Sequence, residues 1–244
     1  MSVSPVLEVA AGSVAAALAA QQGGAMRVEL CNGLDGGGLT PSYGMLGVAR
    51  EHLHIPLYVL IRPRVGDFVF SAQEMDVMCR DVEYCVRLGC DGVVLGALDP
   101  AGDVDMGMMR ALIAAAGPLG VTFHRAMDVS ADPARTLEDA IALGCERVLT
   151  SGARPSALEG AETIAALVVQ AAGRIVVMPG AGVSAGNVVQ LRVLTGAYEF
   201  HASARRVVAA RRLGPHPYIR DLGGDYACTD ADKVRQIVTL LSQE

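Results

Sequence analysis

Short, almost purely apolar runs alternate with longer segments rich in alanine and leucine along this chain of 244 residues. The short runs are typical of strands buried on both faces, and the longer segments have the composition of helices. Strands that alternate with helices pair in parallel through right-handed crossovers. The pattern predicts strands at 6–10, 27–31, 57–61, 92–95, 121–124, 147–149, 175–178 and 197–201, and helices at 13–22, 41–51, 73–88, 106–116, 133–143, 157–172 and 185–194.

Eight such units in a chain of this length predict an α/β fold, a (β/α)8 TIM-type barrel, built as a single domain. We expect the barrel to span residues 1–204. An irregular C-terminal extension, residues 205–244, includes loop-like stretches at 213–217 and 221–225 and ends in a closing helix, 232–241, packed on the barrel. The alternative is an open doubly wound sheet, but the turn after the first run lacks the glycine pattern of a dinucleotide site.

Charge and composition exclude several classes of protein. A formal net charge of −6 leaves no broad basic face for a nucleic acid. No stretch approaches the ~20 apolar residues of a membrane span, and the first residues do not resemble a secretory signal. Six scattered cysteines in a large, core-rich chain fit reduced thiols and a cytoplasmic location.

The scarcity of lysine is more restrictive than these averages. Lys233 is the only lysine, and it lies in the expected closing helix. Schiff-base aldolases and pyridoxal-phosphate enzymes need a lysine in the active site, and a Walker A loop needs one to bind phosphate. The sequence therefore argues against all three classes.

Five ionisable residues interrupt the apolar runs near their ends: Glu29, Arg62, His124, Glu199 and His201. A charge inside a buried strand costs several kcal/mol unless it is paired or bound to something. In a barrel, the C-terminal ends of the strands form the functional face. We therefore expect the five side chains to share one polar pocket at that end.

The carboxylates and imidazoles of this set suggest its chemistry. Glu29, Glu199, His124 and His201 are candidate catalytic residues, for acid–base work or for holding a divalent cation. An internal salt network with Arg62 that fixes the barrel core is an equally good interpretation. Glu8 lies earlier in its strand, which favours a structural role.

Arginines and glycines around the expected mouth suit a small anion. The candidate anion-binding residues are Arg62, Arg64, Arg125, Gly180, Gly182 and Ser203. Arginine binds carboxylate or phosphate groups, and the loops after strands seven and eight of a barrel commonly bind phosphate. A solvated loop tied by arginine–aspartate pairs is the alternative for the segment 62–67.

Soft metal ligands are few. Cu(I) prefers thiolate and thioether sulfur, and the chain has no Cys-x-x-Cys or Cys-x-Cys pair. Cys31 closes the second strand beside the pocket, whereas Cys90 and Cys145 lie at strand entries and are expected to pack. By spacing alone, copper binding has little support.

Several segments together resemble the CutC copper-homeostasis family. They are 28–32, 36–42, 61–68, 91–96, 122–128, 149–152, 178–180 and 199–203. The resemblance implies a cytoplasmic (β/α)8 barrel that forms homo-oligomers and handles copper, with Cys31 at a position linked to copper in some relatives. We expect a homo-oligomer, with a dimer favoured.

Three functions remain open from the sequence: copper homeostasis with Cys31 as a Cu(I) ligand, an enzyme of unknown reaction on a small anionic or phosphorylated substrate, and a partner-binding barrel whose polar residues are structural. The expected partners are a small anion or a metal ion, with copper as the implied cofactor and a divalent cation as the second option. Nucleic acids and membranes are not expected as partners. Whether the chain is an enzyme is left open.

Overall fold

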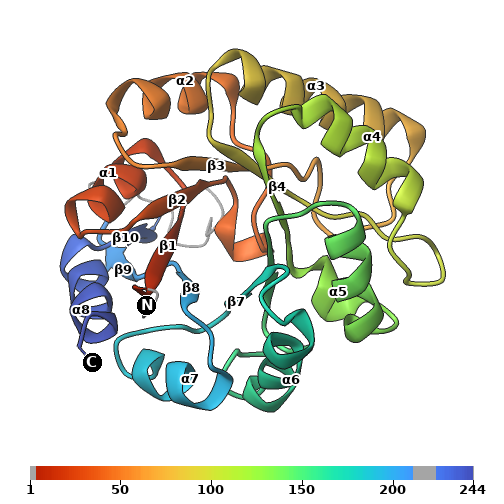
Figure 1. Ribbon diagram of the computed structural model, residues 1–244. Helices are drawn as coiled ribbons and strands as arrows, with labels where there is room; N and C mark the ends of the chain where they lie inside the picture. Colours follow the sequence, from red (N-terminus) through yellow and green to blue (C-terminus); the bar gives the residue numbers. More distant parts are fainter. Residues whose placement is uncertain (1–3, 211–223, 244) are drawn as a thin grey trace.

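Eight parallel strands form a ring that is surrounded by helices in the computed structural model, which describes residues 4–210 and 224–243 (Figure 1). The strands of the ring are β1 (Val6–Ala11), β2 (Arg27–Leu30), β3 (Leu57–Leu60), β4 (Gly92–Leu95), β5 (Gly120–Phe123), β6 (Arg147–Thr150), β7 (Val176–Pro179) and β8 (Glu199–Ala202). The helices are α1 (Val14–Gln22), α2 (Tyr43–His52), α3 (Ala72–Arg87), α4 (Met106–Ala116), α5 (Pro133–Ala142), α6 (Ala161–Ala171), α7 (Val188–Thr195) and α8 (Ala231–Leu241). The prediction of a (β/α)8 barrel is confirmed.

Hydrogen-bonded pairing in the described chain runs in the order β7-β6-β5-β4-β3-β2-β1-β8, and every pair is parallel. β7 and β8 lie next to each other and bring the ring nearly to closure. On the other side of β7, a glycine allows close contact with β6, because a Cβ on Gly180 in the loop after β7 would lie 2.5 Å from Leu149 Cδ1. The first and last strands of the ring, β1 and β8, are hydrogen-bonded neighbours.

Side-chain caps fix where most helices begin. In six helices a serine or aspartate accepts a hydrogen bond from an amide of the first turn: Ser13, Ser42, Ser71, Asp105, Asp132 and Asp230. Five of these caps lie between a strand of the ring and the helix that follows it, and Asp230 lies between β10 and α8. No helix within 4–210 and 224–243 is long and apolar enough to cross a membrane.

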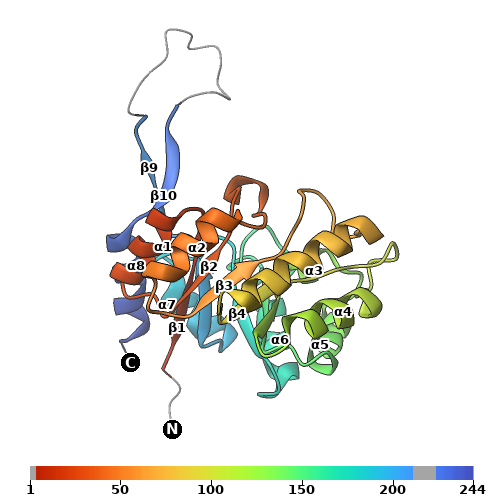
Figure 2. The ribbon, with the colours of Figure 1, turned by 90° about the horizontal axis from the view of Figure 1, so that it is seen from above.

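The chain after β8 adds an antiparallel pair before the last helix. β9 (Arg205–Val208) and β10 (Tyr226–Thr229) stand out from the barrel at the end opposite the N-terminus (Figure 2). α8 then packs against α1, α7 and β1, in the eighth place of the outer ring. The division expected after residue 204 falls between β8 and β9. The loop-like stretch expected at 213–217, and residues 221–223, lie outside the described residues.

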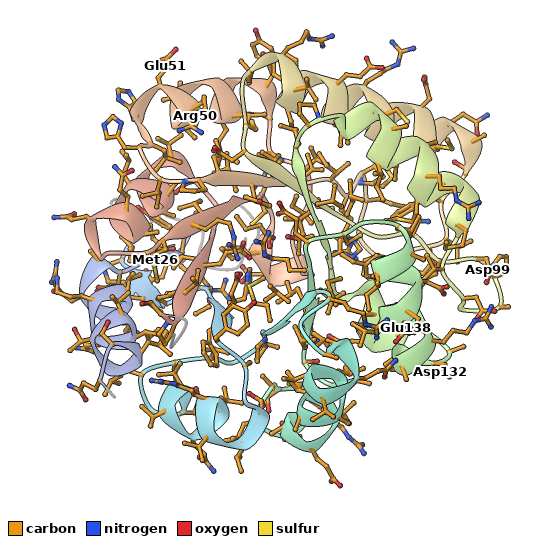
Figure 3. All side chains as sticks on the ribbon, viewed as in Figure 1. Met26, Arg50, Glu51, Asp99, Asp132 and Glu138 are labelled. Carbon is orange, nitrogen blue, oxygen red and sulfur yellow. The ribbon has the colours of Figure 1, made fainter. Side chains whose placement is uncertain are left out.

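Charged side chains fill part of the interior of the ring, whereas apolar ones fill the layer between strands and helices. Glu8 is fully buried, and Arg27, Arg147 and Glu199 are each at most 8 % exposed. We call these four residues the ion network. Figure 3 shows nitrogen and oxygen atoms at the centre of the ring, while labelled charges such as Asp99 and Glu138 lie on the outside.

Each charge of the ion network has an opposite partner. Arg27 Nε donates to Glu8, and Arg27 Nη2 donates to Glu199 Oε2 at 2.6 Å. Arg147 Nε donates to the same oxygen at 3.1 Å. The Tyr58 ring lies against both guanidinium groups, 5.2 Å from Arg27 Cζ and 5.1 Å from Arg147 Cζ. Every charge of the network is thus paired, and all four residues are buried.

The expectation that Glu199 lies at the barrel mouth is wrong. It is the first residue of β8, and its partners Arg27 and Arg147 are the first residues of β2 and β6. These positions belong to the N-terminal end of the barrel, away from the loops that follow the strands. The apolar run was expected to begin at Ala197, and the later start of β8 moves Glu199 to the strand entry.

We expect Glu199→Ala to lower the free energy of unfolding by about 3–5 kcal/mol, because it leaves two buried guanidinium groups without their shared carboxylate. Asp76→Ala removes an exposed partner of Arg80 and serves as the control, with no measurable effect on stability. Urea unfolding of both variants at pH 7 tests this. Equal midpoints for Glu199→Ala and the unmodified chain would contradict the structural role of the network.

Candidate functional site

A cavity of about 470 Å³ opens at the C-terminal ends of the strands. We call it the mouth cavity. It brings together seven of the predicted site residues: Glu29, Arg62, His124, Arg125, Gly182, His201 and Ser203. It also includes Phe68, Asp128 and Arg205, which were not predicted.

His124 lines this cavity and carries a buried, neutral hydrogen-bond donor. It follows β5 and caps the short turn Arg125–Val129, where its Nδ1 accepts the Ala126 amide at 3.2 Å. Nδ1 is therefore the acceptor nitrogen, so the proton of the neutral ring lies on Nε2. Burial, together with the charge of Arg62, lowers the pKa of His124 to about 3. The buried Nε2 has no hydrogen-bond partner among the described residues.

Arg62 offers a second donor of the same kind. Its two Nη atoms are held by the carbonyls of Gly36, Gly38 and Gly66. Its buried Nε finds no partner in the described chain. Phe68 packs against both residues, with its ring centroid 4.8 Å from that of His124 and 4.9 Å from Arg62 Cζ. We call Arg62 Nε and His124 Nε2 the donor pair.

Glu29, Glu8 and His201 meet deeper in the barrel, on the neighbouring strands β2, β1 and β8. We call them the carboxylate–histidine cluster. His201 Nδ1 lies 2.8 Å from Glu8 Oε1 and 3.7 Å from Glu29 Oε2. Glu29 Oε2 is buried and has no hydrogen-bond partner among the described residues. Glu8, expected to be structural, links this cluster to the ion network through Arg27.

The environments of the two carboxyls differ, and so do their pKa values. Burial raises the pKa of Glu29 to about 7. Burial also acts to raise the pKa of Glu8, but Arg27 and His201 outweigh it and lower that pKa to about 2. Burial acts to lower the pKa of His201, while Glu29 and Glu8 raise it above its usual value. One carboxyl is thus held ionised, and the other exchanges its proton near neutral pH.

Not all the predicted anion-binding residues line the mouth cavity. Arg64 donates to Glu74 at 2.5 Å and to Asp67 at 3.0 Å, so its segment is the arginine–aspartate loop considered as the alternative. Arg125 lines the cavity and is paired with Asp128 at 2.7 Å. Gly180 lies outside the lining and serves the close packing of β7 described above.

Asp128 organises the part of the rim that follows β6. Its carboxylate accepts the Thr150 hydroxyl at 2.5 Å, the Ser151 amide at 2.9 Å and the Ala153 amide at 3.1 Å. Asp128 is not among the site residues that the sequence predicts, although its neighbours His124 and Arg125 are. An acidic residue four positions after a strand-end histidine was the available signal.

Cys31 does not have the surroundings of a copper ligand. It is fully buried among Tyr58, Leu60 and Val94, and it is not among the described residues that line the mouth cavity. Its thiol donates to the Ala11 carbonyl at 3.7 Å. Burial raises the pKa of the thiol well above its usual value, which opposes the thiolate that binds Cu(I). The donor set at Cys31 does not fit a Cu(I) centre.

Comparison with known proteins gives consistent matches along the chain. Residues 5–206 match the family model described as "CutC family". A family protein CutC from Xylella fastidiosa (strain Temecula1) is 85 % identical over 243 residues, covering 100 % of this chain and 91 % of that protein. Another from Xanthomonas campestris pv. campestris (strain 8004) is 77 % identical over 235 residues, covering 96 % of this chain and 98 % of the relative. A crystal structure from Streptococcus agalactiae, described as a candidate copper homeostasis protein CutC, is 34 % identical with a TM-score of 0.78, covering 82 % of this chain and 98 % of that one.

We expect Glu29→Gln to stabilise the fold at pH 8 by about 1–3 kcal/mol and to have little effect at pH 4.5. The raised pKa of Glu29 means that the folded chain keeps a proton that the unfolded chain releases above about pH 4.5. Stability from this group is therefore complete at low pH and is lost as the pH rises through about 7. Urea unfolding of both proteins in EDTA across this pH range measures the difference in the free energy of unfolding between Glu29→Gln and the unmodified chain. A difference that favours the variant less at pH 8 than at pH 4.5 would contradict the expected sign.

Proposed function

The chain belongs to the CutC family, and we propose that it functions by binding a small molecule with an anionic oxygen, such as a carboxylate or a phosphate, in the mouth cavity. The observation that carries this proposal is the donor pair. A buried donor without a partner costs about 1–3 kcal/mol, so two such donors beside one aromatic ring indicate a ligand that accepts from both. The ion network is fully paired, so a purely structural role accounts for that end of the barrel and not for this one.

The proton on His124 Nε2 and the positive charge of Arg62 suit an anionic oxygen better than a metal ion. His124 Nε2 carries a proton, and Arg62 is a cation, so both attract negative charge. Gly182 and Ser203 line the same cavity from the loops after β7 and β8, where barrels commonly bind phosphate. Ala181 and Ala204 in these loops have left-handed backbones, with φ of 76° and 44°. Such strain in residues with a Cβ is typical of functional sites.

The same cavity has groups for chemistry on the bound molecule. A neutral imidazole that donates to an oxygen polarises the bond to that oxygen. Glu29 lines the same cavity, and its Oε2 has no hydrogen-bond partner among the described residues. We therefore propose acid–base catalysis on a small anionic substrate as the role of the site. Glu29 and His201 are the candidates for proton transfer, and His124 is the candidate for polarising the substrate.

Copper handling, which the family resemblance implies and the description of the Streptococcus agalactiae relative mentions, does not enter this proposal through Cys31. The sulfur is buried and outside the cavity lining, and burial raises the pKa of the thiol. A cytoplasmic location and a homodimer stay predictions.

We expect inorganic phosphate to raise the melting temperature of the protein and His124→Ala to weaken phosphate binding about tenfold or more, because it removes one charge-assisted hydrogen bond. Titration calorimetry at pH 7 in EDTA measures both dissociation constants. His52→Ala, at an exposed position at the end of α2, is the matched control and should bind as the unmodified chain does. Equal affinity of His124→Ala and the unmodified chain, or no binding of phosphate, acetate or malonate, would contradict the proposal.

We expect Cys31→Ala to leave the affinity for Cu(I) unchanged within about twofold, since the thiol is not available as a thiolate. A competition titration with a chromogenic Cu(I) chelator under anaerobic conditions measures this. Cys79→Ala, at a partly exposed thiol of α3, gives the comparison for adventitious copper. Loss of high-affinity Cu(I) binding in Cys31→Ala alone would restore Cys31 as a ligand.

A further inference from the structure

The carboxylate–histidine cluster has three donor atoms arranged around one point. One ligand atom from each of Glu8, Glu29 and His201 lies within 4.8 Å of the other two. The nearest pair, His201 Nδ1 and Glu8 Oε1, is 2.8 Å apart, and His201 Nδ1 and Glu29 Oε2 are 3.7 Å apart. Metal–ligand bonds of about 2.0–2.2 Å place neighbouring ligand atoms roughly 3.0–3.5 Å apart, so the two separations from His201 Nδ1 need only small shifts.

A second observation points to a ligand at this place. Glu29 is 5 % exposed, and its Oε2, the atom that faces His201, has no hydrogen-bond partner in the described chain. A buried carboxylate oxygen without a donor is a position that a cation or a proton fills. Glu8, by contrast, is held in orientation by Arg27 on its other oxygen, which is how many metal-ligating carboxylates are fixed.

The charges of the interior also favour a cation. Glu8 and Glu199 each form an ion pair with a buried guanidinium group, whereas no arginine of the described residues forms an ion pair with Glu29. The guanidinium groups of Arg27 and Arg147 both donate hydrogen bonds to Glu199, at the N-terminal end of the ring. The carboxylate without an arginine partner, Glu29, lines the mouth cavity together with His201, and an ion would enter through this cavity.

We propose that Glu8 Oε1, Glu29 Oε2 and His201 Nδ1 bind one divalent first-row cation, of the class of Zn²⁺ or Mn²⁺, at the floor of the mouth cavity. Two carboxylate oxygens and one imidazole nitrogen suit such an ion, whereas Cu(I) prefers sulfur. This inference extends the proposed function, because the ion would lie beside the anion that the donor pair binds. Three protein ligands leave further coordination positions open toward the cavity.

The test uses the full chain treated with EDTA and then titrated with Co²⁺ or Zn²⁺ alone. Co²⁺ should bind about one equivalent and give visible absorption typical of mixed nitrogen and oxygen ligands. Glu29→Gln keeps the shape of the side chain and removes its charge, and it should weaken Zn²⁺ binding about tenfold or more. Glu138→Gln, an exposed carboxylate paired with Arg174 on the outside of the barrel, is the matched control and should bind Zn²⁺ unchanged.

His201→Gln provides a second removal of a ligand if the first variant folds poorly, and circular dichroism confirms the fold of each. The absence of a one-equivalent Co²⁺ spectrum, or equal Zn²⁺ affinity in Glu29→Gln and Glu138→Gln, would overturn the proposal. A measurement of phosphate binding in EDTA distinguishes the failure of the metal-site proposal from the failure of the anion-binding proposal. Phosphate binding without Co²⁺ binding refutes the metal site alone, and Co²⁺ binding without phosphate binding refutes the anion pocket alone.

Discussion

The ion network in the interior of the barrel is the interaction on which the rest of the structure depends. Barrel interiors are usually filled by branched apolar side chains in layers, whereas here Arg27 joins Glu8 on β1 to Glu199 on β8, and Arg147 brings β6 to the same carboxylate. These contacts link strands that are far apart in the sequence across the centre of the ring. Because a buried charge is tolerated only with good partners, the network also restricts how the strands can be aligned.

The two ends of the interior differ in how well their polar groups are satisfied. At the N-terminal end, every charge of the network has a partner. Toward the mouth, Glu29 Oε2, Arg62 Nε and His124 Nε2 are buried without one. The paired end supports the fold, and the unpaired end supplies the chemistry. Glu8 belongs to both, since one oxygen contacts Arg27 and the other contacts His201.

The sequence predicts the fold well because the fold depends on local patterns of apolar and polar residues along the chain. Apolar runs and capped helices recur in register, and the eight predicted strands match the observed ones within a few residues. Glu29, His124 and His201 were found as functional candidates because each breaks an apolar strand near the mouth. The grouping of the charged residues was only partly predictable. Glu199 was expected beside these three residues, but it lies at the opposite end of the barrel from His124.

Partners across the barrel could not be predicted from one sequence. Arg27 and Arg147 begin their strands, where an arginine usually reaches solvent, and nothing local shows that both turn inward to share Glu199. The burial of Cys31 was hidden for the same reason, because it depends on Tyr58, Leu60 and Val94 from other strands. Strand alignment decides which side chains meet, and that alignment is a property of the closed ring.

The most direct test of the central claim is a crystal structure of the protein grown or soaked at neutral pH with phosphate. The account predicts a phosphate oxygen within about 3 Å of both His124 Nε2 and Arg62 Nε, next to the Phe68 ring. It would be contradicted by a phosphate bound elsewhere on the chain while these two nitrogens contact only protein atoms.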